Sequence, residues 1–272
     1  FPANTVPWEM NLPDIEKKRV PVNPVDSLEE RIISSIDEKT RAVALDWVDF
    51  YTGYRIDLDA VSGACAEHDA FLVVDGIQGC GALHLDLSKV HVDFFSANSA
   101  KWLLGPVGSG LLYVNSKTVP KLKSAFRGWM SLEWSEFNHF DPLPPLKQGA
   151  GRFEAGSYAG ILLSGFKENL KLLNSIGITE IERRVLALRN RLLQSFRDMG
   201  ADIISPPSDN NASGILTFRF AEANNSALFN HLSENKVKAS LREDSIRLSP
   251  HFYNTLEEVE KVVGLIKDFL YS

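Results

Sequence analysis

Cysteine is scarce in this chain of 272 residues, which contains only Cys65 and Cys80. Two cysteines cannot form the disulfide framework of a small secreted domain, so we expect a reducing compartment and predict a cytoplasmic protein. Long apolar runs are missing as well: none approaches the roughly 20 residues that a membrane-spanning helix needs, and there is no charged-then-apolar signal segment. The sequence therefore predicts a protein without a membrane partner.

Positive charge is not in excess either. The 29 lysines and arginines are outnumbered by 35 aspartates and glutamates, which gives a formal net charge of −6, and there is no basic stripe. This balance argues against a nucleic-acid partner. The six histidines, at positions 68, 84, 91, 139, 231 and 251, are scattered without metal-ligand spacing, so we predict no metal site.

A phosphate-binding G-x-x-x-x-G-K-[ST] loop is also absent. The glycine-rich stretch GPVGSG at 105–110 lacks the following lysine and leads into a strand rather than a helix. A P-loop nucleotide hydrolase is therefore disfavoured. We interpret the stretch as a close approach of backbone to a sheet.

The first two-thirds of the chain alternate short apolar strands with helical patterns, which is typical of βαβ units and a mostly parallel sheet. The expected strands cover residues 19–22, 42–48, 70–75, 92–96 and 110–114. Helices are expected after a capping box at Ser27 and Glu30, and over 57–68, 158–175 and 179–199, the last capped by Thr179 and Glu182. The aromatic and proline-rich segment 117–151 predicts a long ordered loop excursion.

The last 70 or so residues predict a smaller α+β unit. Its expected strands are 215–220, 237–241 and 245–249, with Glu243-Asp244 as a turn. Helices are expected over 226–234 and after Thr255, which forms a capping box with Glu258. We predict two domains, residues 1–170 and 171–272, with the boundary inside the long helices.

Two side chains at the ends of neighbouring strands carry the chemistry. Asp75 follows an apolar strand, and Lys101 follows the next one, 26 residues later. A strand-end aspartate can also cap a helix or bind Mg²⁺ in a nucleotide hydrolase, and a lone lysine is usually a surface residue. Here Lys101 precedes Trp102-Leu103-Leu104, so we expect a buried strand-to-turn junction, where a lysine must be paired or chemically used. A lysine can form a Schiff base with an aldehyde cofactor whose ring nitrogen a carboxylate keeps protonated.

Further polar residues accompany this pair. Gln78 could donate to a phenolate oxygen or be an ordinary loop amide. The small residues Ser96, Asn98 and Ser99 could hydrogen-bond a phosphate. Arg247 is either a surface arginine or a bidentate fork for a substrate carboxylate, a role for which Arg242 is the alternative.

Taken in order, several segments resemble the class V aminotransferase family of fold type I pyridoxal phosphate (PLP) enzymes, which includes cysteine desulfurases and isopenicillin N epimerase-like proteins. The resemblance implies a three-layer α/β large domain with a smaller α+β C-terminal domain. It also implies that relatives carry on the order of a hundred further residues before the position that matches Phe1. The matching segments are 1–8, 52–58, 73–87, 92–114, 128–129, 152–157 and 246–260.

The resemblance implies a role for each residue of the cofactor site. Lys101 would form the Schiff base with PLP, Asp75 would pair with the pyridine nitrogen, and Gln78 would meet the phenolic oxygen. Asn98 stands where relatives place a phosphate-binding serine, and Phe1 would stack on the cofactor ring.

Two more residues acquire roles from the same resemblance. Arg247 would grip the α-carboxylate of an amino-acid substrate. Ser157 would reach the cofactor phosphate of the partner subunit in a homodimer. Ala100 replaces the histidine of desulfurases, and no cysteine lies in the loop before Arg247, where desulfurases carry one, so we predict that the chain is not a cysteine desulfurase.

The most specific prediction is a PLP-dependent aminotransferase of class V, with a lyase or an epimerase left open. The alternative is a non-catalytic binding or scaffold protein that has kept the fold without the cofactor.

Overall fold

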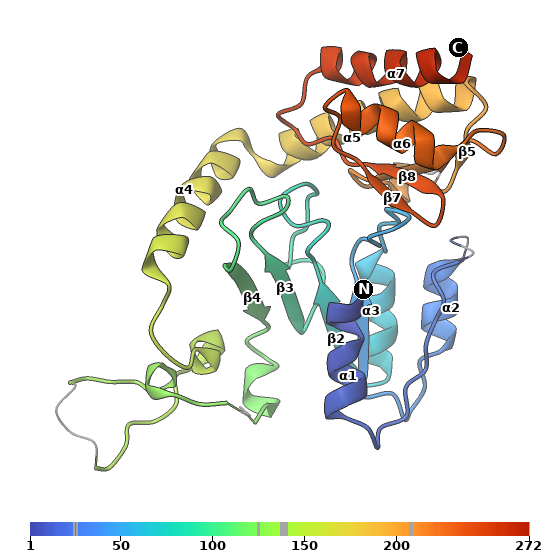
Figure 1. Ribbon diagram of the computed structural model, residues 1–272. Helices are drawn as coiled ribbons and strands as arrows, with labels where there is room; N and C mark the ends of the chain where they lie inside the picture. Colours follow the sequence, from blue (N-terminus) through green and yellow to red (C-terminus); the bar gives the residue numbers. More distant parts are fainter. Residues whose placement is uncertain (24, 26, 124–125, 137–140, 207–208, 272) are drawn as a thin grey trace.

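The computed structural model describes residues 1–272 except 24, 26, 124–125, 137–140, 207–208 and 272. Figure 1 shows two packed parts, each built around its own sheet, with α4 running along one side between them. The helices are α1 (Val6–Asn11), α2 (Leu28–Ser34), α3 (Leu58–Glu67), α4 (Gly160–Ile176), α5 (Ile178–Asp198), α6 (Asn225–Glu234) and α7 (Leu256–Tyr271). Short 3₁₀ helices are η1 (Pro2–Asn4), η2 (Val119–Lys121), η3 (Trp129–Ser131), η4 (Gly149–Phe153) and η5 (Asp209–Asn211).

The first sheet contains β1 (Ala42–Asp46), β2 (Phe71–Asp75), β3 (Phe94–Asn98) and β4 (Gly110–Val114), in that spatial order. The first three strands are parallel and β4 is antiparallel to β3. The register pairs Asp46 with Asp75 and Asp75 with Ser96, so three polar residues line the carboxyl edge of the sheet. The predicted mostly parallel sheet is confirmed.

The expected strand at residues 19–22 is wrong. This segment has no strand partner in the described part of the chain. Its carbonyl groups are used by a side chain instead, because Arg31 donates from Nη1 to Pro21 O and from Nη2 to Val22 O at 3.2 Å. Pro21 also has no N–H to offer a neighbouring strand.

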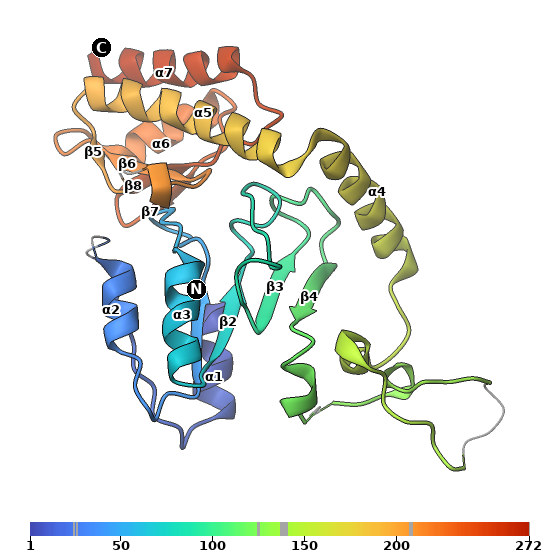
Figure 2. The ribbon, with the colours of Figure 1, turned by 180° about the vertical axis from the view of Figure 1, so that it is seen from behind.

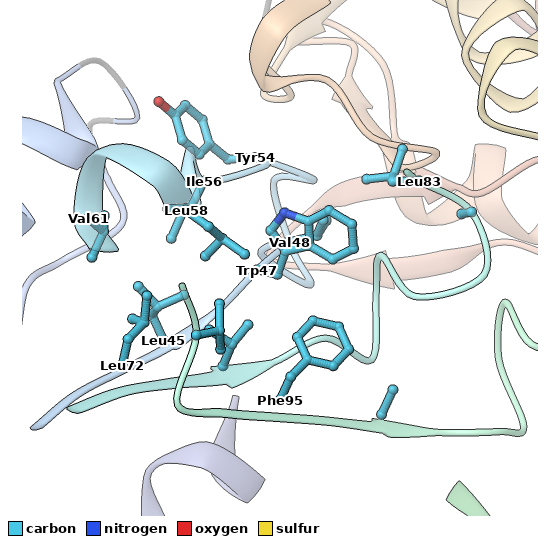
Figure 3. Close-up of a cluster of buried hydrophobic side chains, with 14 of the residues drawn as sticks. Leu45, Trp47, Val48, Tyr54, Ile56, Leu58, Val61, Leu72, Leu83 and Phe95 are labelled. Carbon is cyan, nitrogen blue, oxygen red and sulfur yellow. The ribbon is translucent and has the colours of Figure 1, made fainter. Parts of the chain in front are cut away.

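Apolar side chains of this sheet form a core with α3 and the loops that follow β1 and β2. Figure 3 shows Leu45, Leu72 and Phe95 in this cluster, together with Trp47, whose ring meets the Phe95 ring edge-on at 6.1 Å. Gly76 follows Asp75 directly, and a Cβ on it would lie 1.9 Å from Phe95 Cζ. A glycine is therefore required for the loop after Asp75 to cross the core.

The second sheet contains β5 (Asp202–Ile203), β6 (Leu216–Arg219), β7 (Ser240–Arg242) and β8 (Ser245–Leu248), in the order β5-β6-β8-β7 and antiparallel throughout. Helices α5, α6 and α7 gather on one side of this sheet, as Figure 2 shows from behind. The predicted small α+β unit is confirmed, although β7 begins at Ser240 and not at Val237. The Glu243-Asp244 turn has φ angles of 46° and 61°, as a tight hairpin requires.

The three expected capping boxes have different outcomes. Thr255 and Glu258 exchange the reciprocal side-chain-to-backbone bonds of a capping box, at 3.2 and 2.9 Å. Among the described residues, the Ser27 side chain makes no capping hydrogen bond, and its φ is 57°, so the prediction there is wrong. The box at Thr179 is also wrong, because α5 begins one residue earlier and Glu182 pairs instead with Arg55 Nη1 at 2.6 Å.

Helix α5 contributes to two hydrophobic clusters. Ile181 and Val185 pack with the first sheet, whereas Leu188 and the apolar residues after it pack with the second. The loop after β1 joins the same parts, because Ser205 Oγ donates to Thr52 O at 2.6 Å and Ser213 Oγ donates to Gly53 O at 2.7 Å. The domain boundary at residues 170 and 171 stays a prediction. Among the described residues, no helix combines the length and the apolar character that membrane crossing requires.

Candidate active site

Asp75 ends β2 at the carboxyl edge of the first sheet. Its Oδ1 accepts a hydrogen bond from the Ile77 N–H at 2.9 Å, which fixes the carboxylate at the strand end. Burial raises the pKa of the half-buried Asp75 carboxyl, and the negative charge of Asp46 raises it further. The Ile77 bond and the positive charge of Lys101 act in the opposite direction.

Lys101 lies in the turn after β3, where Trp102 and Leu103 beside it are buried. Its side chain is exposed, so the expectation of a buried lysine is wrong: the two apolar neighbours fill the core and leave the lysine at the surface. Partial desolvation nevertheless lowers the pKa of the Lys101 ammonium, and the positive charges of Arg247 and Arg242 add to this effect. The negative charges of Asp75 and Asp46 oppose it.

Two aromatic rings lie between Lys101 and the second part of the molecule. Lys101 Nζ lies 6.0 Å from the centroid of the Phe1 ring. The Phe1 ring meets the Phe50 ring edge-on at 5.3 Å, and Arg242 Cζ lies 5.4 Å from the centroid of Phe50. These four side chains form a continuous row from the turn after β3 to the β7–β8 hairpin.

Arg247 enters the site from β8. It donates through Nη1 to Phe50 O and through Nη2 to Ser240 Oγ at 3.4 Å. Its Nε is buried and has no hydrogen-bond partner among the described residues. Burial lowers the pKa of the Arg247 guanidinium, Arg242 lowers it further, and Asp49 opposes both.

The two remaining predicted polar residues, Gln78 and Asn98, differ in burial and in hydrogen bonding. Gln78 is buried in the loop after Asp75, and its side chain makes no hydrogen bond within the described part of the chain. Asn98 is exposed, and its Oδ1 accepts from the Ala100 N–H at 2.6 Å, which leaves its NH₂ group available. Both amides can therefore donate to a ligand.

The Ser99 hydroxyl already has hydrogen-bond partners, and Ser157 belongs to a different segment of the chain. Ser99 is completely buried, and its hydroxyl lies 2.6 Å from Pro106 O and 2.6 Å from Ser109 Oγ. These bonds hold the 99–109 turn, so the hydroxyl is not free for a phosphate and Ser99 is not carried into the proposed site. Ser157 is exposed in the segment before α4.

Two residues of this cluster, Asp46 and Phe50, were not foreseen as site residues, whereas Arg242 was foreseen only as the alternative to Arg247. Asp46 ends β1 in register with Asp75, and Phe50 lies in the loop after that strand. Their position at and after the end of the first parallel strand could have indicated a role in the site, because the carboxyl ends of parallel strands meet at one edge of the sheet. In the described ranges, no three His, Cys, Asp or Glu side chains gather as a metal site would require. His139 lies outside the described residues.

The sequence matches a known family. The model of the family described as aminotransferase class-V matches residues 1–262, and the chain belongs to this family. An uncharacterized aminotransferase of Bacillus subtilis, YcbU, is 29% identical over 237 residues, which are 87% of this chain and 62% of the relative. The chain thus spans less than two-thirds of that protein. A probable cysteine desulfurase of Pyrococcus abyssi is 23% identical over 290 residues, covering 99% of this chain and 70% of the relative.

Solved structures show the same fold. The apo cysteine desulfurase of Thermococcus onnurineus superposes with a TM-score of 0.77 at 21% identity, over 93% of this chain and 64% of the other. The cysteine desulfurase CsdA of Escherichia coli gives a TM-score of 0.81 at 22% identity, over 98% and 69%. The predicted fold type I α/β architecture is therefore confirmed.

Proposed function

We propose that this chain belongs to a PLP-dependent enzyme that acts on an amino acid through Lys101, with transamination as the preferred reaction. The observation that carries the proposal is the placement of Asp75 and Lys101 after adjacent strands, where each charge acts on the pKa of the other. Family membership identifies pyridoxal phosphate as the cofactor.

The residues of this edge fit the ring of the cofactor. Asp75 keeps one carboxylate oxygen free of the Ile77 bond and would pair with the ring nitrogen. The amide of the buried Gln78, which has no hydrogen-bond partner among the described residues, would donate to the ring oxygen. Phe1 would lie against the ring face. The phosphate would be met by the Asn98 NH₂ group. When bound, PLP supplies an aldehyde that takes up an amino group and a ring that withdraws electrons from the α-carbon.

Lys101 and Arg247 supply the remaining actions. The lowered pKa of Lys101 favours the neutral amine, which is the form that attacks an aldehyde and accepts a proton. Arg247 is held between Phe50 O and Ser240 Oγ, so its guanidinium is oriented before a ligand arrives. A substrate α-carboxylate bound there would fix which bond of the α-carbon faces Lys101. Transamination, elimination and epimerisation share these steps and differ only in where the proton is returned or which group leaves.

Cysteine desulfurase activity is disfavoured even though relatives bear that name. The β7–β8 hairpin, whose second strand carries Arg247, contains no cysteine. Cys65 is buried, and burial raises the pKa of the Cys80 thiol to about 11, so neither offers a thiolate at neutral pH.

We further propose a homodimer in which the exposed Ser157 reaches the cofactor phosphate of the partner, and a cytoplasmic location. Exposure leaves the Ser157 hydroxyl accessible to a second chain. A non-catalytic binding or scaffold role is the second candidate, because the Lys101 side chain is exposed and Ser99 does not serve a phosphate.

Borohydride reduction separates these two candidates. The protein is incubated with PLP, reduced and digested, and the peptides are mapped by mass spectrometry. We expect a pyridoxyl group on Lys101, loss of that adduct and of the visible cofactor band in Lys101→Ala, and no loss in the control Lys89→Ala, whose exposed side chain lies 3.6 Å from Asp86. An adduct on another lysine refutes the assignment, and no adduct favours the scaffold.

A further inference from the structure

Arg242 is a positively charged residue at the edge of the candidate site. It ends β7, is exposed, and places its guanidinium over the ring of Phe50. Within the part of the chain that the structure describes, its side chain makes no ion pair and no hydrogen bond. By contrast, Arg247 on the next strand is held by two acceptors.

The backbone that carries Arg242 is held firmly. The two-residue turn after it has positive φ at both Glu243 and Asp244, which fixes the hairpin geometry. Asp244 Oδ2 accepts from Asn225 Nδ2 at 3.3 Å, and Asn225 is only 1% exposed. The hairpin tip is thereby anchored on α6, so Arg242 projects from a rigid base.

Three positively charged side chains act on one another along this row of residues. Arg242 lowers the pKa of both Arg247 and Lys101, so the three cations lie within electrostatic reach of each other. The nearby Asp49 carboxylate already accepts from Tyr51 N at 3.0 Å and Thr52 N at 2.6 Å. An anionic ligand would relieve the repulsion that these cations exert on each other.

Room for such a ligand exists beside Arg242. A cavity of about 480 Å³ lies between the loop after β1 and the β7–β8 hairpin. Phe50 and Leu241 contribute apolar surface to it, and Arg242 contributes a positive charge. Asp49 and Glu243 contribute negative charges, of which the Asp49 carboxylate is already engaged by two backbone N–H groups. Its volume falls within the range of small-molecule sites, roughly 300–1,000 Å³.

We propose that Arg242 is a specificity-determining residue that binds a second acidic group of the substrate. The preferred substrate would then be an amino acid with an acidic side chain, carboxylate or sulfinate, held at one end by Arg247 and at the other by Arg242. This inference rests on the proposed function, which assigns the α-carboxylate to Arg247. The planar guanidinium offers the paired donors that either acid group accepts.

Binding of a simple dianion tests the inference without any turnover. The full chain is titrated calorimetrically with succinate and with butyrate, as the parent and as Arg242→Gln. We expect Arg242→Gln to weaken succinate binding about tenfold to a hundredfold, the usual loss for one charge-assisted contact, with butyrate binding unchanged. Arg219→Gln is the matched control, since Arg219 pairs with Asp202 at 3.3 Å on the second sheet. Unchanged succinate binding in Arg242→Gln, or equal loss for both ligands, overturns the inference.

Amino-acid turnover then separates this inference from the proposed function. The PLP-loaded protein is mixed with L-glutamate and with its neutral isostere L-glutamine, while the adduct on Lys101 is mapped in parallel. A preference for glutamate that Arg242→Gln reduces at least tenfold supports the inference. A Lys101 adduct with equal use of both amino acids overturns the inference and leaves the proposed function standing. If no adduct forms, the proposed function fails, and the succinate titration alone decides whether Arg242 binds an acidic group.

Discussion

Asp46 and Asp75 occupy paired positions at the ends of two neighbouring parallel strands, so two carboxylates meet at the edge where Lys101 also lies. The Asp46 side chain is only 15% exposed and its Oδ1 accepts from Asn4 Nδ2 at 3.0 Å. Its charge therefore acts on the other two residues through a partly dry environment, in which such effects are stronger than in water.

Replacing Asp46 with Asn should lower two pKa values together. The pKa of Asp75 should fall because a like charge is removed, and the pKa of Lys101 should fall because an opposite charge is removed. Carboxyl NMR titration reports the first change, and the pH dependence of chemical labelling of Lys101 reports the second. Asp86→Asn, a change on the surface, should alter neither; an unchanged Asp75 pKa in Asp46→Asn would contradict the electrostatic coupling.

Gly76→Ala should destabilise the protein by about 1–3 kcal/mol, the usual cost of overfilling a packed core. The new methyl group would lie 1.9 Å from Phe95 Cζ, so the ring or the loop after Asp75 must move. Urea unfolding measures the change. Gly63→Ala in α3 is the control, because nothing lies within 4 Å of its added Cβ and alanine favours a helix interior by roughly 0.5–1 kcal/mol.

Glu182→Gln should cost about 1–2 kcal/mol of the free energy of unfolding, since it weakens charge-assisted hydrogen bonds at a partly buried site. Glu182 accepts from Arg55 Nη1 at 2.6 Å and from the His84 N–H at 3.1 Å, and the ion-paired side chains are 18% and 20% exposed. The exposed pair of Arg183 and Glu180 on the same helix is the comparison. Glu180→Gln should leave the urea midpoint unchanged, and equal effects of the two variants would be evidence against the special role of Glu182.

His251 should make stability fall on the acid side of neutrality. Its Nδ1 accepts from the Phe252 N–H at 2.9 Å and its Nε2 lies 3.2 Å from Trp102 O, so the neutral ring is held at both nitrogens. Burial lowers the pKa of His251 below the ordinary value of 6.5, despite the Trp102 bond. As the pH falls, the unfolded chain therefore takes up the proton at a higher pH than the folded chain does. The stabilisation from the neutral ring is complete above the ordinary value of 6.5 and declines as the pH falls below 6.5.

Urea midpoints between pH 5 and pH 8 test this dependence. The parent chain should lose stability as the pH falls below the ordinary histidine value, and His251→Gln should lose less over the same interval. His84→Gln, on an exposed side chain, should keep the parent's slope. The same slope in all three proteins would show that His251 does not titrate differently on folding.

Strand periodicity was sufficient to predict the parallel sheet and to place Asp75 and Lys101 after neighbouring strands, because burial on both faces leaves continuous apolar runs. It could not predict that Lys101 is exposed, since Trp102 and Leu103 satisfy the same apolar pattern. Nor could it predict the row through Phe1 and Phe50, because that contact joins a terminal segment to a loop. Ser27 shows the related limit for local motifs: the residues of a capping box were present, but its φ of 57° prevents the bond.

Helix α5 has a consequence for how the whole chain melts. Its first turns belong to one hydrophobic cluster and its later turns to the other, while Ser205 and Ser213 tie the second part to the loop after β1. Unfolding of either cluster would therefore disturb α5, on which the other cluster packs. A scanning calorimeter should therefore record a single heat-absorption peak for this chain, with no separate transition for either end.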